Sequence, residues 1–427
     1  METQNRVYVS LMAYDLVGSE ILRIAAEVNR LKALGKEIIN FTVGDFNPKD
    51  FQLPAELTER IILNYREGQT NYPPAMGTPE LRNAIANLYK DMLGVHYDAN
   101  EILVGAGCRP LIYTFFATII DPGDKVVFGV PSWNTNHYCH LVGAMPIEVQ
   151  TSARNRFLPM AEDLAEQLVD ATVLALCSPS NPSGTMYERD ELADICAIVL
   201  RINEQRTLRG AKPLYILYDQ IYWKLSAKGR EHYHPVLIEP KLKDFVVYVD
   251  GISKSLAATG IRVGWMLGSK PVIEKMSSIL GHIGAWAPKP EQLGLAAYLP
   301  MQDVSEQFNI QLKSKIFGRL EALYQGFREM ALSGLPINAL EPQGAIYLTV
   351  EVAIIGRKTE DGVILTKADD ILSYLMHEAG VAIVPFYAFG IRSDHWFRIS
   401  VGGISDSDVE KSLKNIRQAL LKLQPRY

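Results

Sequence analysis

Residues 250–265 read DGISKSLAATGIRVGW, and they follow directly on the apolar run FVVYV at residues 245–249. The apolar run predicts a strand that delivers Lys254 to the edge of a sheet. Ser253 precedes the lysine, and Arg262 follows eight positions after it. Hydroxyl groups and a guanidinium together suit a phosphate, because an arginine side chain can donate two parallel hydrogen bonds to phosphate oxygens. A partly desolvated lysine beside a phosphate site is a candidate for Schiff-base chemistry, although an isolated Ser-Lys-Ser is more often a solvated loop.

The bulk composition is typical of a soluble globular protein. The chain has 427 residues, too many for one compact core, and we expect two domains. Hydrophobic residues make up 48% and charged residues 21%, and the net charge of −5 gives no basis for binding nucleic acid or an anionic membrane. The first residues, METQNR, lack the apolar segment of a secretory signal, and no apolar run is long enough to span a bilayer. We therefore expect a cytoplasmic protein without nucleic acid or membrane partners.

The cysteines and histidines form neither a disulfide nor a metal pattern. The four cysteines show no C-x-x-C spacing and are expected to be reduced thiols: Cys108, Cys139, Cys177 and Cys196. His232 and His234 flank Tyr233, but no third ligand type clusters near them. We predict no metal site.

A glycine turn between a strand and a helix offers a second place for an anion. Residues 102–110 read ILVGAGCRP, in which a short strand leads through Gly107 and Cys108 into a helix. The N-terminus of such a helix presents free N–H groups to an anion. Pro110 stands where the dinucleotide fingerprint has its third glycine, so a nicotinamide site is a weak interpretation.

Polar residues follow two strands of buried character. The run TVLALC at 172–177 leads into SPSNPSG, which contains Asn181 in a turn fixed by prolines. The run LYILYD at 214–219 ends in Asp219, and Tyr222 stands three residues further on. Sheets of α/β proteins bind ligands at the carboxyl ends of their strands, which is where these polar residues stand. The turn that contains Asn181, taken alone, is also compatible with a purely structural role.

Helical spacing and polar segments predict the remaining elements. We expect a helix capped by Thr78, a helix over about 189–202, and a long helix over about 304–330 that connects two domains. Residues 203–213 are interpreted as a polar surface insertion, and residues 355–366 as a loop insertion.

In their order along the chain, these segments resemble the motifs of class I and II aminotransferases, the fold-type I pyridoxal-phosphate enzymes that include aspartate aminotransferase. The resemblance covers roughly residues 20 to 425. It implies an α/β fold, in which a large domain with a mostly parallel seven-stranded sheet between helices is joined to a smaller α+β domain. We expect residues 1–50 to join the small domain, residues 51–305 to form the large cofactor-binding domain, and residues 306–427 to form the small domain.

The resemblance implies that pyridoxal 5'-phosphate is the cofactor and that Lys254 holds it covalently. Asp219 would pair with the pyridine nitrogen, and Tyr222 and Asn181 would contact the phenolic oxygen. Lys254, Asp219 and Tyr222 are the residues expected to be catalytic.

The remaining cofactor contacts are also implied by the resemblance. The phosphate would be bound by Ser253, Arg262 and the backbone of Gly107 and Cys108. Cys108 stands where the family usually has a small residue or a hydroxyl residue. Trp133 of the segment PSW would stack on the pyridine, although a buried tryptophan at a helix start is also common.

One further cofactor residue predicts the assembly. Tyr72 lies in the segment YPPAMGTPELR and would reach the phosphate in a neighbouring subunit, which implies a homodimer with shared active sites. An exposed aromatic in a proline-rich loop is the alternative.

Five residues are expected to contact the substrate: Gly44, Trp133, Asn181, Arg398 and Arg109. Arg398 lies on the apolar strand WFRISVG at 396–402 and would clamp the α-carboxylate. Gly44 would meet the carboxylate through its backbone, or it serves only a turn. Arg109 aligns with a lysine that binds the distal carboxylate in dicarboxylate-specific members, but a surface arginine is the alternative.

The implied activity is ping-pong transfer of an amino group from an L-amino acid to a 2-oxo acid, possibly aspartate and 2-oxoglutarate. The same scaffold also carries carbon–sulfur lyases and other elimination enzymes, because the cofactor supplies the electron sink. A non-catalytic sensor is a third alternative, but such a protein normally carries a DNA-binding segment, which this sequence lacks.

Overall fold

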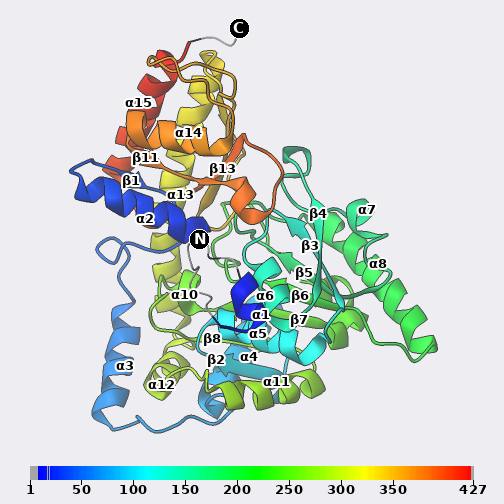
Figure 1. The fold of residues 1–427 in the computed structure, drawn as a ribbon. Coiled ribbons are helices and arrows are strands. Elements are labelled where there is room, and N and C mark those ends of the chain that lie inside the picture. The colour runs from blue at the N-terminus through cyan, green and yellow to red at the C-terminus, as the bar shows by residue number, and fades with distance from the viewer. Residues whose placement is uncertain (1–7, 17, 19, 425–427) are drawn as a thin grey trace.

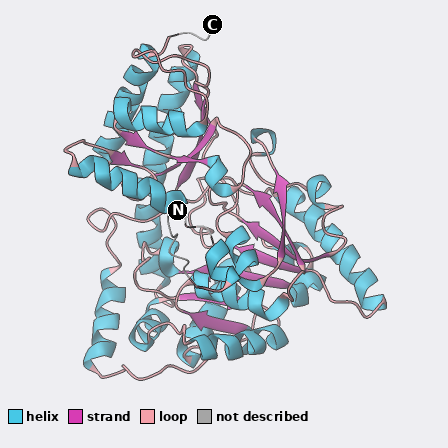
Figure 2. Ribbon diagram, viewed as in Figure 1, coloured by secondary structure: helices cyan, strands magenta, loops and turns pink. Residues whose placement is uncertain are grey.

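The computed structural model describes residues 8–16, 18 and 20–424. Figure 1 shows a large lower body and a smaller upper body, with the long helix α13 (Gln302–Leu332) reaching from one to the other. Figure 2 shows a twisted sheet with helices on both of its faces in the lower body. The α/β class expected from the sequence is confirmed.

The large sheet has seven strands in the order β2-β8-β7-β6-β5-β3-β4. Strand β8 is antiparallel to both of its neighbours, and the other pairings in this sheet are parallel, as predicted. The bounds are β2 Ile102–Gly105, β3 Lys125–Val130, β4 Met145–Gln150, β5 Ala171–Cys177, β6 Tyr215–Asp219, β7 Val246–Gly251 and β8 Gly264–Leu267.

Side chains alternate between the two faces of this sheet and build two cores. On β7, Val247 and Val249 join the core that contains helices α5 (Cys108–Ile119) and α11 (Lys270–Ile283). Val246 and Tyr248 join the opposite core, which contains α4 (Pro79–Leu93), α8 (Arg189–Leu208) and α12 (Lys289–Tyr298). Because both faces are covered, the central strands β5, β6 and β7 are largely apolar instead of alternating with polar residues, whereas the edge strand β4 is mostly exposed.

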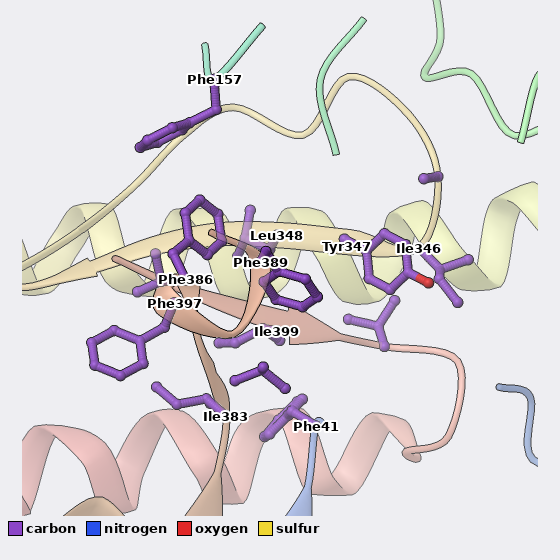
Figure 3. Close-up of a cluster of buried hydrophobic side chains, with 14 of the residues drawn as sticks. Phe41, Phe157, Ile346, Tyr347, Leu348, Ile383, Phe386, Phe389, Phe397 and Ile399 are labelled. Atoms are coloured by element: carbon purple, nitrogen blue, oxygen red, sulfur yellow. The ribbon is translucent and has the colours of Figure 1, made fainter. Parts of the chain in front are cut away.

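The smaller body contains a four-stranded antiparallel sheet of order β12-β13-β10-β9 and the parallel pair β1-β11. Figure 3 shows part of its core, where Phe386, Phe389 and Phe397 gather beside Tyr347. The bounds are β1 Ile39–Asn40, β9 Ile337–Ala339, β10 Tyr347–Val352, β11 Val381–Ala382, β12 Val384–Pro385 and β13 Trp396–Ser400.

The N-terminal segment touches both bodies. Strand β1 pairs with β11 of the smaller body, whereas the backbone oxygen of Met12 lies 2.7 Å from Nε2 of His140 on α6. The domain boundaries at residues 50 and 305 stay a prediction.

The remaining helices are α1 Leu11–Asp15, α2 Glu20–Ala33, α3 Ala55–Arg66, α4 Pro79–Leu93, α6 Thr135–Val142, α7 Ala161–Leu164, α8 Arg189–Leu208, α9 Pro235–Ile238, α10 Ile252–Ser255, α12 Lys289–Tyr298, α14 Ala368–Tyr374 and α15 Asp406–Lys422.

Helix α8 corrects one expectation from the sequence. The helix was predicted to end near Ile202, with a surface insertion over 203–213, but it continues to Leu208. Asn203 is buried, and its side chain accepts a hydrogen bond from the Leu214 N–H (2.7 Å) and donates one to the Leu214 carbonyl (2.9 Å). This buried amide ties the helix to the start of β6, and the tertiary contact overrides the polar local sequence.

Two helix boundaries agree with the sequence. The Thr78 side chain caps α4 by accepting a hydrogen bond from the Leu81 N–H, with Pro79 at the first helical position. Strand β7 leads at Gly251 into the short helix α10, which places Lys254 just beyond the carboxyl end of the sheet. Residues 355–366 form a loop with an isolated bridge between Lys358 and Ile364.

Candidate active site

A cavity of about 580 Å³ opens at the carboxyl ends of β5 and β6 and reaches the smaller body. It gathers eleven of the residues singled out in the sequence: Gly44, Cys108, Arg109, Trp133, Asn181, Asp219, Tyr222, Ser253, Lys254, Arg262 and Arg398. Gly107 lies next to this lining at the start of α5, while Tyr72 does not line the cavity. Residues separated by more than 350 positions in the sequence thus share one site.

Lys254 projects into this cavity from α10. Its Nζ donates a hydrogen bond of 2.5 Å to the Gly44 carbonyl and lies 5.8 Å from the centre of the Tyr222 ring. Burial lowers the pKa of this amine from 10.5 to about 8, with Asp45 opposing the shift and the Arg398 charge adding to it. A lysine in this state has a substantial neutral fraction near neutral pH and is therefore suited to attack a carbonyl carbon.

We expect the reactivity of Lys254 in the cofactor-free protein to rise with pH around a midpoint of about 8. The neutral amine is the nucleophile, so labelling increases as the pH rises through the pKa. Solvated lysines of the same chain should show midpoints near ~10.4. The measurement is pulse labelling with an amine-reactive reagent at a series of pH values, read residue by residue by peptide mass mapping. A Lys254 midpoint equal to that of the solvated lysines would contradict the burial argument.

Asp219 lies at the end of β6 on the floor of the cavity. Its carboxylate accepts a hydrogen bond of 3.1 Å from the Ile221 N–H. Burial raises its pKa to about 6, while the Ile221 hydrogen bond and the Lys254 charge act in the opposite direction. No ion pair of Asp219 occurs in the part of the chain that the structure describes. A protonated ring nitrogen placed opposite this carboxylate would supply the missing cation.

The start of α5 and Arg262 form a cradle for an anion. Helix α5 has no side-chain cap, so its first N–H groups are free of a capping side chain, and Gly107 precedes them with φ 83°. A Cβ at Gly107 would overlap the Arg262 guanidinium, so a side chain would fill the cradle. Arg262 is held by hydrogen bonds from Nη1 to the Thr259 carbonyl (2.7 Å) and from Nη2 to the Ala106 carbonyl (3.0 Å).

Arg398 is buried in the wall of the smaller body, with 1% of its surface exposed. Its Nη1 donates to Oδ1 of Asn181 (3.0 Å), and Nη2 donates to the Thr42 carbonyl (2.5 Å). The guanidinium carbon lies 4.6 Å from the Tyr347 ring and 5.0 Å from the Phe389 ring, two of the aromatic residues drawn in Figure 3. Nε has no partner among the described residues, and a buried arginine without a carboxylate calls for an anionic ligand.

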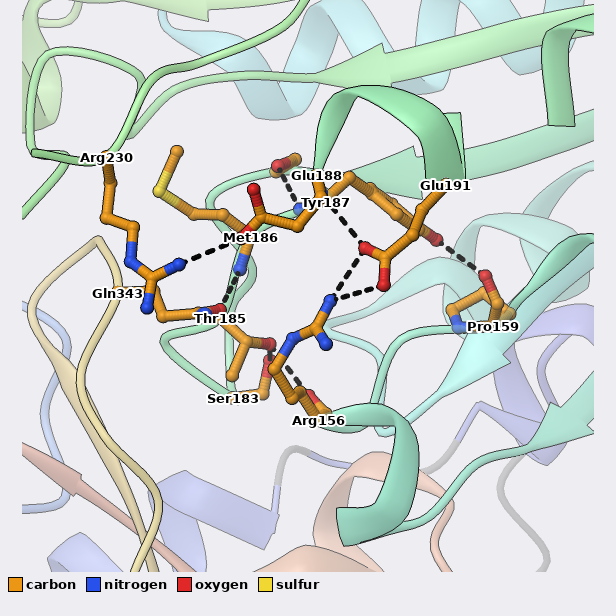
Figure 4. A network of polar contacts seen from close by, with 11 residues as sticks. Arg156, Pro159, Ser183, Thr185, Met186, Tyr187, Glu188, Glu191, Arg230 and Gln343 are labelled. Atoms are coloured by element: carbon orange, nitrogen blue, oxygen red, sulfur yellow. Dashed lines mark hydrogen bonds and ion pairs between the residues drawn. The ribbon is translucent and has the colours of Figure 1, made fainter. Parts of the chain in front are cut away.

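The loop that carries Asn181 is anchored on both sides. Figure 4 shows the network: Arg156 pairs with Glu191 (2.6 and 2.7 Å) and accepts through its carbonyl a hydrogen bond from the Thr185 hydroxyl (2.8 Å). The Gln343 side chain accepts from the Met186 N–H at 2.9 Å. Since Gln343 precedes β10 of the smaller body, this loop positions Asn181 relative to both bodies.

Trp133, Arg109 and Tyr72 occupy different places around the site. The Arg109 guanidinium stacks over Trp133, with 4.4 Å between its central carbon and the ring centre, and both line the cavity. Tyr72 is 82% exposed and meets Trp286 edge-on, with 5.4 Å between ring centres.

Several residues of the site had no role predicted from the sequence. The Tyr347 hydroxyl lies 2.6 Å from the Tyr222 hydroxyl, and the Thr259 hydroxyl donates to Asp45 at 2.6 Å on the cavity rim. Tyr347 begins β10, and the periodicity of a strand does not distinguish a core tyrosine from one that faces a cavity. Its pairing partner is 125 residues away in the sequence.

The described residues contain neither a metal-binding cluster nor a membrane-spanning helix. No group of three or more metal-ligating side chains lies together there. Among those residues, no helix is both long and apolar enough to cross a membrane.

The donor set of the cavity suits pyridoxal 5'-phosphate. The free N–H groups at α5 and Arg262 fit a phosphate, Asp219 fits a ring nitrogen, and Lys254 fits an aldehyde carbon. Together with the seven-stranded sheet, this arrangement places the chain among the fold-type I pyridoxal-phosphate enzymes.

Comparisons with known proteins define the family. The model of the family described as "Aminotransferase class I and II" matches residues 36–416. The aspartate aminotransferase of Bacillus sp. (strain YM-2) is 31% identical over 88% of this chain and 91% of its own length. The probable aspartate/prephenate aminotransferase of Rickettsia prowazekii is 31% identical over 94% of this chain and 96% of its own.

A solved structure agrees with these sequence matches. The aspartate aminotransferase from Rhizobium meliloti superposes with a TM-score of 0.88 at 26% identity, covering 98% of this chain and 100% of that one. The chain belongs to the class I and II aminotransferases and is a pyridoxal-phosphate-dependent aminotransferase that acts on amino acids and oxo acids. The comparisons do not favour the elimination enzyme considered from the sequence.

Proposed function

We propose that the preferred amino donor is a dicarboxylic amino acid, with L-aspartate and 2-oxoglutarate as the pair exchanged in a ping-pong reaction. The observation that carries the proposal is a pair of guanidinium groups on one cavity, Arg398 and Arg109, neither of which has an ion-pair partner among the described residues. Arginine is the side chain best suited to bind a carboxylate bidentately. The aspartate aminotransferases among the relatives agree with this choice.

The residues divide into those that hold the cofactor and those that hold the substrate. When bound, pyridoxal 5'-phosphate supplies the electron sink that stabilises negative charge at the substrate Cα. The phosphate would be held by Ser253, Arg262 and the N–H groups after Gly107, and the Trp133 ring would pack against the pyridine. Asp219 would keep the ring nitrogen protonated, while Tyr222 and Asn181 would donate to the phenolic oxygen.

The substrate is oriented by the smaller body and acted on by Lys254. Arg398 holds the α-carboxylate, beside the backbone of Gly44. The neutral amine of Lys254 would remove the proton from the substrate Cα and hold it for return during the transfer. Its pKa of about 8 suits this work, because a base is most effective when its pKa is close to the working pH.

The assembly is proposed to be a homodimer with shared active sites. The observation that supports it is the exposed Tyr72, which does not reach the cavity of its own chain and is free to complete the cradle of a second copy. We also propose a cytoplasmic role in amino acid biosynthesis. The four free cysteines are compatible with a reducing compartment.

Arg109→Gln tests the substrate class. We expect kcat/KM for L-aspartate to fall about 30- to 100-fold, which is the loss expected for one charge-assisted hydrogen-bonded contact. The value for L-alanine should change less than about threefold, because alanine has no distal carboxylate. Steady-state kinetics with both donors and 2-oxoglutarate measure the two ratios.

Arg109→Lys is the matched control, since it keeps the positive charge and should retain most of the preference for aspartate. Equal losses for aspartate and alanine in Arg109→Gln would contradict the assignment, because they would point to a general role in stacking against Trp133. Wild-type protein that prefers alanine or phenylalanine over aspartate would contradict the dicarboxylate proposal itself.

A further inference from the structure

A buried polar cluster lies behind the cavity, on the opposite face of the large sheet. The Asp250 carboxylate, 1% exposed, accepts three hydrogen bonds of 2.7 Å each. The donors are the Tyr89 hydroxyl on α4, Nε1 of Trp223 after β6, and the Gly251 N–H. The Tyr89 hydroxyl in turn accepts from the Gln220 amide (2.9 Å) and from Nε1 of Trp265 (3.2 Å).

The members of this cluster are sequence neighbours of residues in the site. Gln220 follows Asp219, and Trp223 follows Tyr222. Asp250 lies four positions before Lys254, at the end of the strand that leads into α10. Because side chains alternate along a strand, Asp250 of β7 points to the face opposite Val249, and its hydrogen bonds to Tyr89 and Trp223 support the backbone of the site from behind.

Three glycines, Gly251, Gly264 and Gly107, pack the backbone of this turn directly against the phosphate cradle. A Cβ at Gly251 would come within 2.8 Å of the Gly264 Cα, and a Cβ at Gly264 would come within 2.8 Å of the Gly107 carbonyl carbon. The Cys108 thiol also donates to the Asp250 carbonyl at 3.3 Å. The turn before Lys254 and the start of α5 are therefore packed backbone against backbone, and a shift of one displaces the other.

The cluster needs a carboxylate for a chemical reason. Asp250 has no ion pair among the described residues, and a buried carboxyl group without a cation is costly unless several donors satisfy it. An amide at this position presents its own N–H groups to at least one of the three donors. Only an acceptor group with two oxygens can therefore satisfy all three donors, which come from α4, from the loop after β6 and from the Gly251 backbone.

We propose that Asp250 is a positioning residue that sets the separation between the Lys254 amine and the phosphate cradle. The proposal rests on the assignment of Lys254 and the cradle under the proposed function. Pyridoxal 5'-phosphate is held at both points, so its binding depends on that separation. Pyridoxal, which has the same aldehyde and ring but no phosphate, would make no contact with the cradle, so its binding at Lys254 does not depend on that separation.

The test compares these two aldehydes on cofactor-free protein. For wild type, Asp250→Asn and Tyr89→Phe, each aldehyde is titrated, trapped with borohydride and located by peptide mass mapping. In Asp250→Asn we expect the Kd for pyridoxal 5'-phosphate to rise about 10- to 100-fold, which is the range expected when a buried donor is left without an acceptor. The Kd for pyridoxal should change less than about threefold. Tyr89→Phe should shift the same ratio in the same direction, by less.

Tyr248→Phe is the matched control, because Tyr248 lies buried on the same strand and accepts a hydrogen bond from the Val236 N–H (3.1 Å). We expect it to leave both affinities unchanged. Equal loss of both aldehydes in Asp250→Asn and Tyr89→Phe would overturn the inference as general damage, and so would an unchanged ratio in both. A wild type that traps neither aldehyde at Lys254 would overturn the proposed function as well, which separates the two failures.

Discussion

Replacement of Lys254 by alanine will lower kcat for every amino donor by about 10⁴-fold, the upper range for loss of a general acid–base group. The amine at this position is the cavity's one proposed base for the Cα proton, and its pKa of about 8 matches that task. The variant should still fold, because Lys254 sits in a short helix at the cavity and the cores on either side of the sheet do not include its side chain. Steady-state kinetics and circular dichroism measure the two effects.

Two comparisons make this prediction specific. A small primary amine added to Lys254→Ala should restore part of the turnover, since it can take the vacated place of the side-chain amine. Lys212→Ala, which removes a lysine paired with Asp121 and Asp124 away from the cavity, should retain wild-type turnover. Turnover of Lys254→Ala within tenfold of wild type would exclude Lys254 as the base.

Asp219→Asn will lower kcat by about 10³-fold and change KM for the amino donor by much less. The proposed reason is that an amide cannot keep the ring nitrogen protonated, and breaking a buried ion pair of this kind costs about 3–5 kcal/mol. The loss would appear in kcat because the protonated ring nitrogen stabilises negative charge that develops at the substrate Cα during the reaction and not on substrate binding. Rapid-mixing absorbance spectroscopy of the half-reaction measures the rate directly.

Asp219→Glu is the conservative comparison, because it keeps the carboxylate but moves it by one methylene group. It should recover part of the rate that Asp219→Asn loses. If Asp219→Asn instead raised KM with kcat unchanged, Asp219 would be a substrate-binding residue, and its pairing with the ring nitrogen would be wrong.

Much of this fold was predictable because the decisive strands are apolar throughout and end in polar residues. The runs at 172–177 and 214–219 predicted parallel strands, and their neighbours Asn181 and Asp219 lie at the cavity as expected. Thr78 with Pro79 predicted the start of α4, because the capping signal is local in sequence. These features depend on residues within a few positions of one another.

The features that escaped prediction depend on distant pairs. Asn203 keeps α8 helical through a polar segment by bonding to Leu214, so the predicted helix end near Ile202 was wrong, although most of residues 204–213 do lie on the surface. Tyr347 reaches Tyr222 across 125 positions, and Asp250 reaches Tyr89 across 161. A buried carboxyl before a lysine turn is not distinguishable in the sequence from a solvated one, because its donors come from other elements.

Transfer of the amino group of a dicarboxylic amino acid at this cavity can be observed in a single half-reaction. Wild-type protein loaded with pyridoxal 5'-phosphate is mixed with L-aspartate without any 2-oxo acid. The absorbance of the cofactor is followed together with the amounts of oxaloacetate and ammonia. We expect full conversion of the cofactor to its amine form with one oxaloacetate per subunit and no ammonia. Unchanged cofactor absorbance, or release of ammonia over many turnovers, would contradict it.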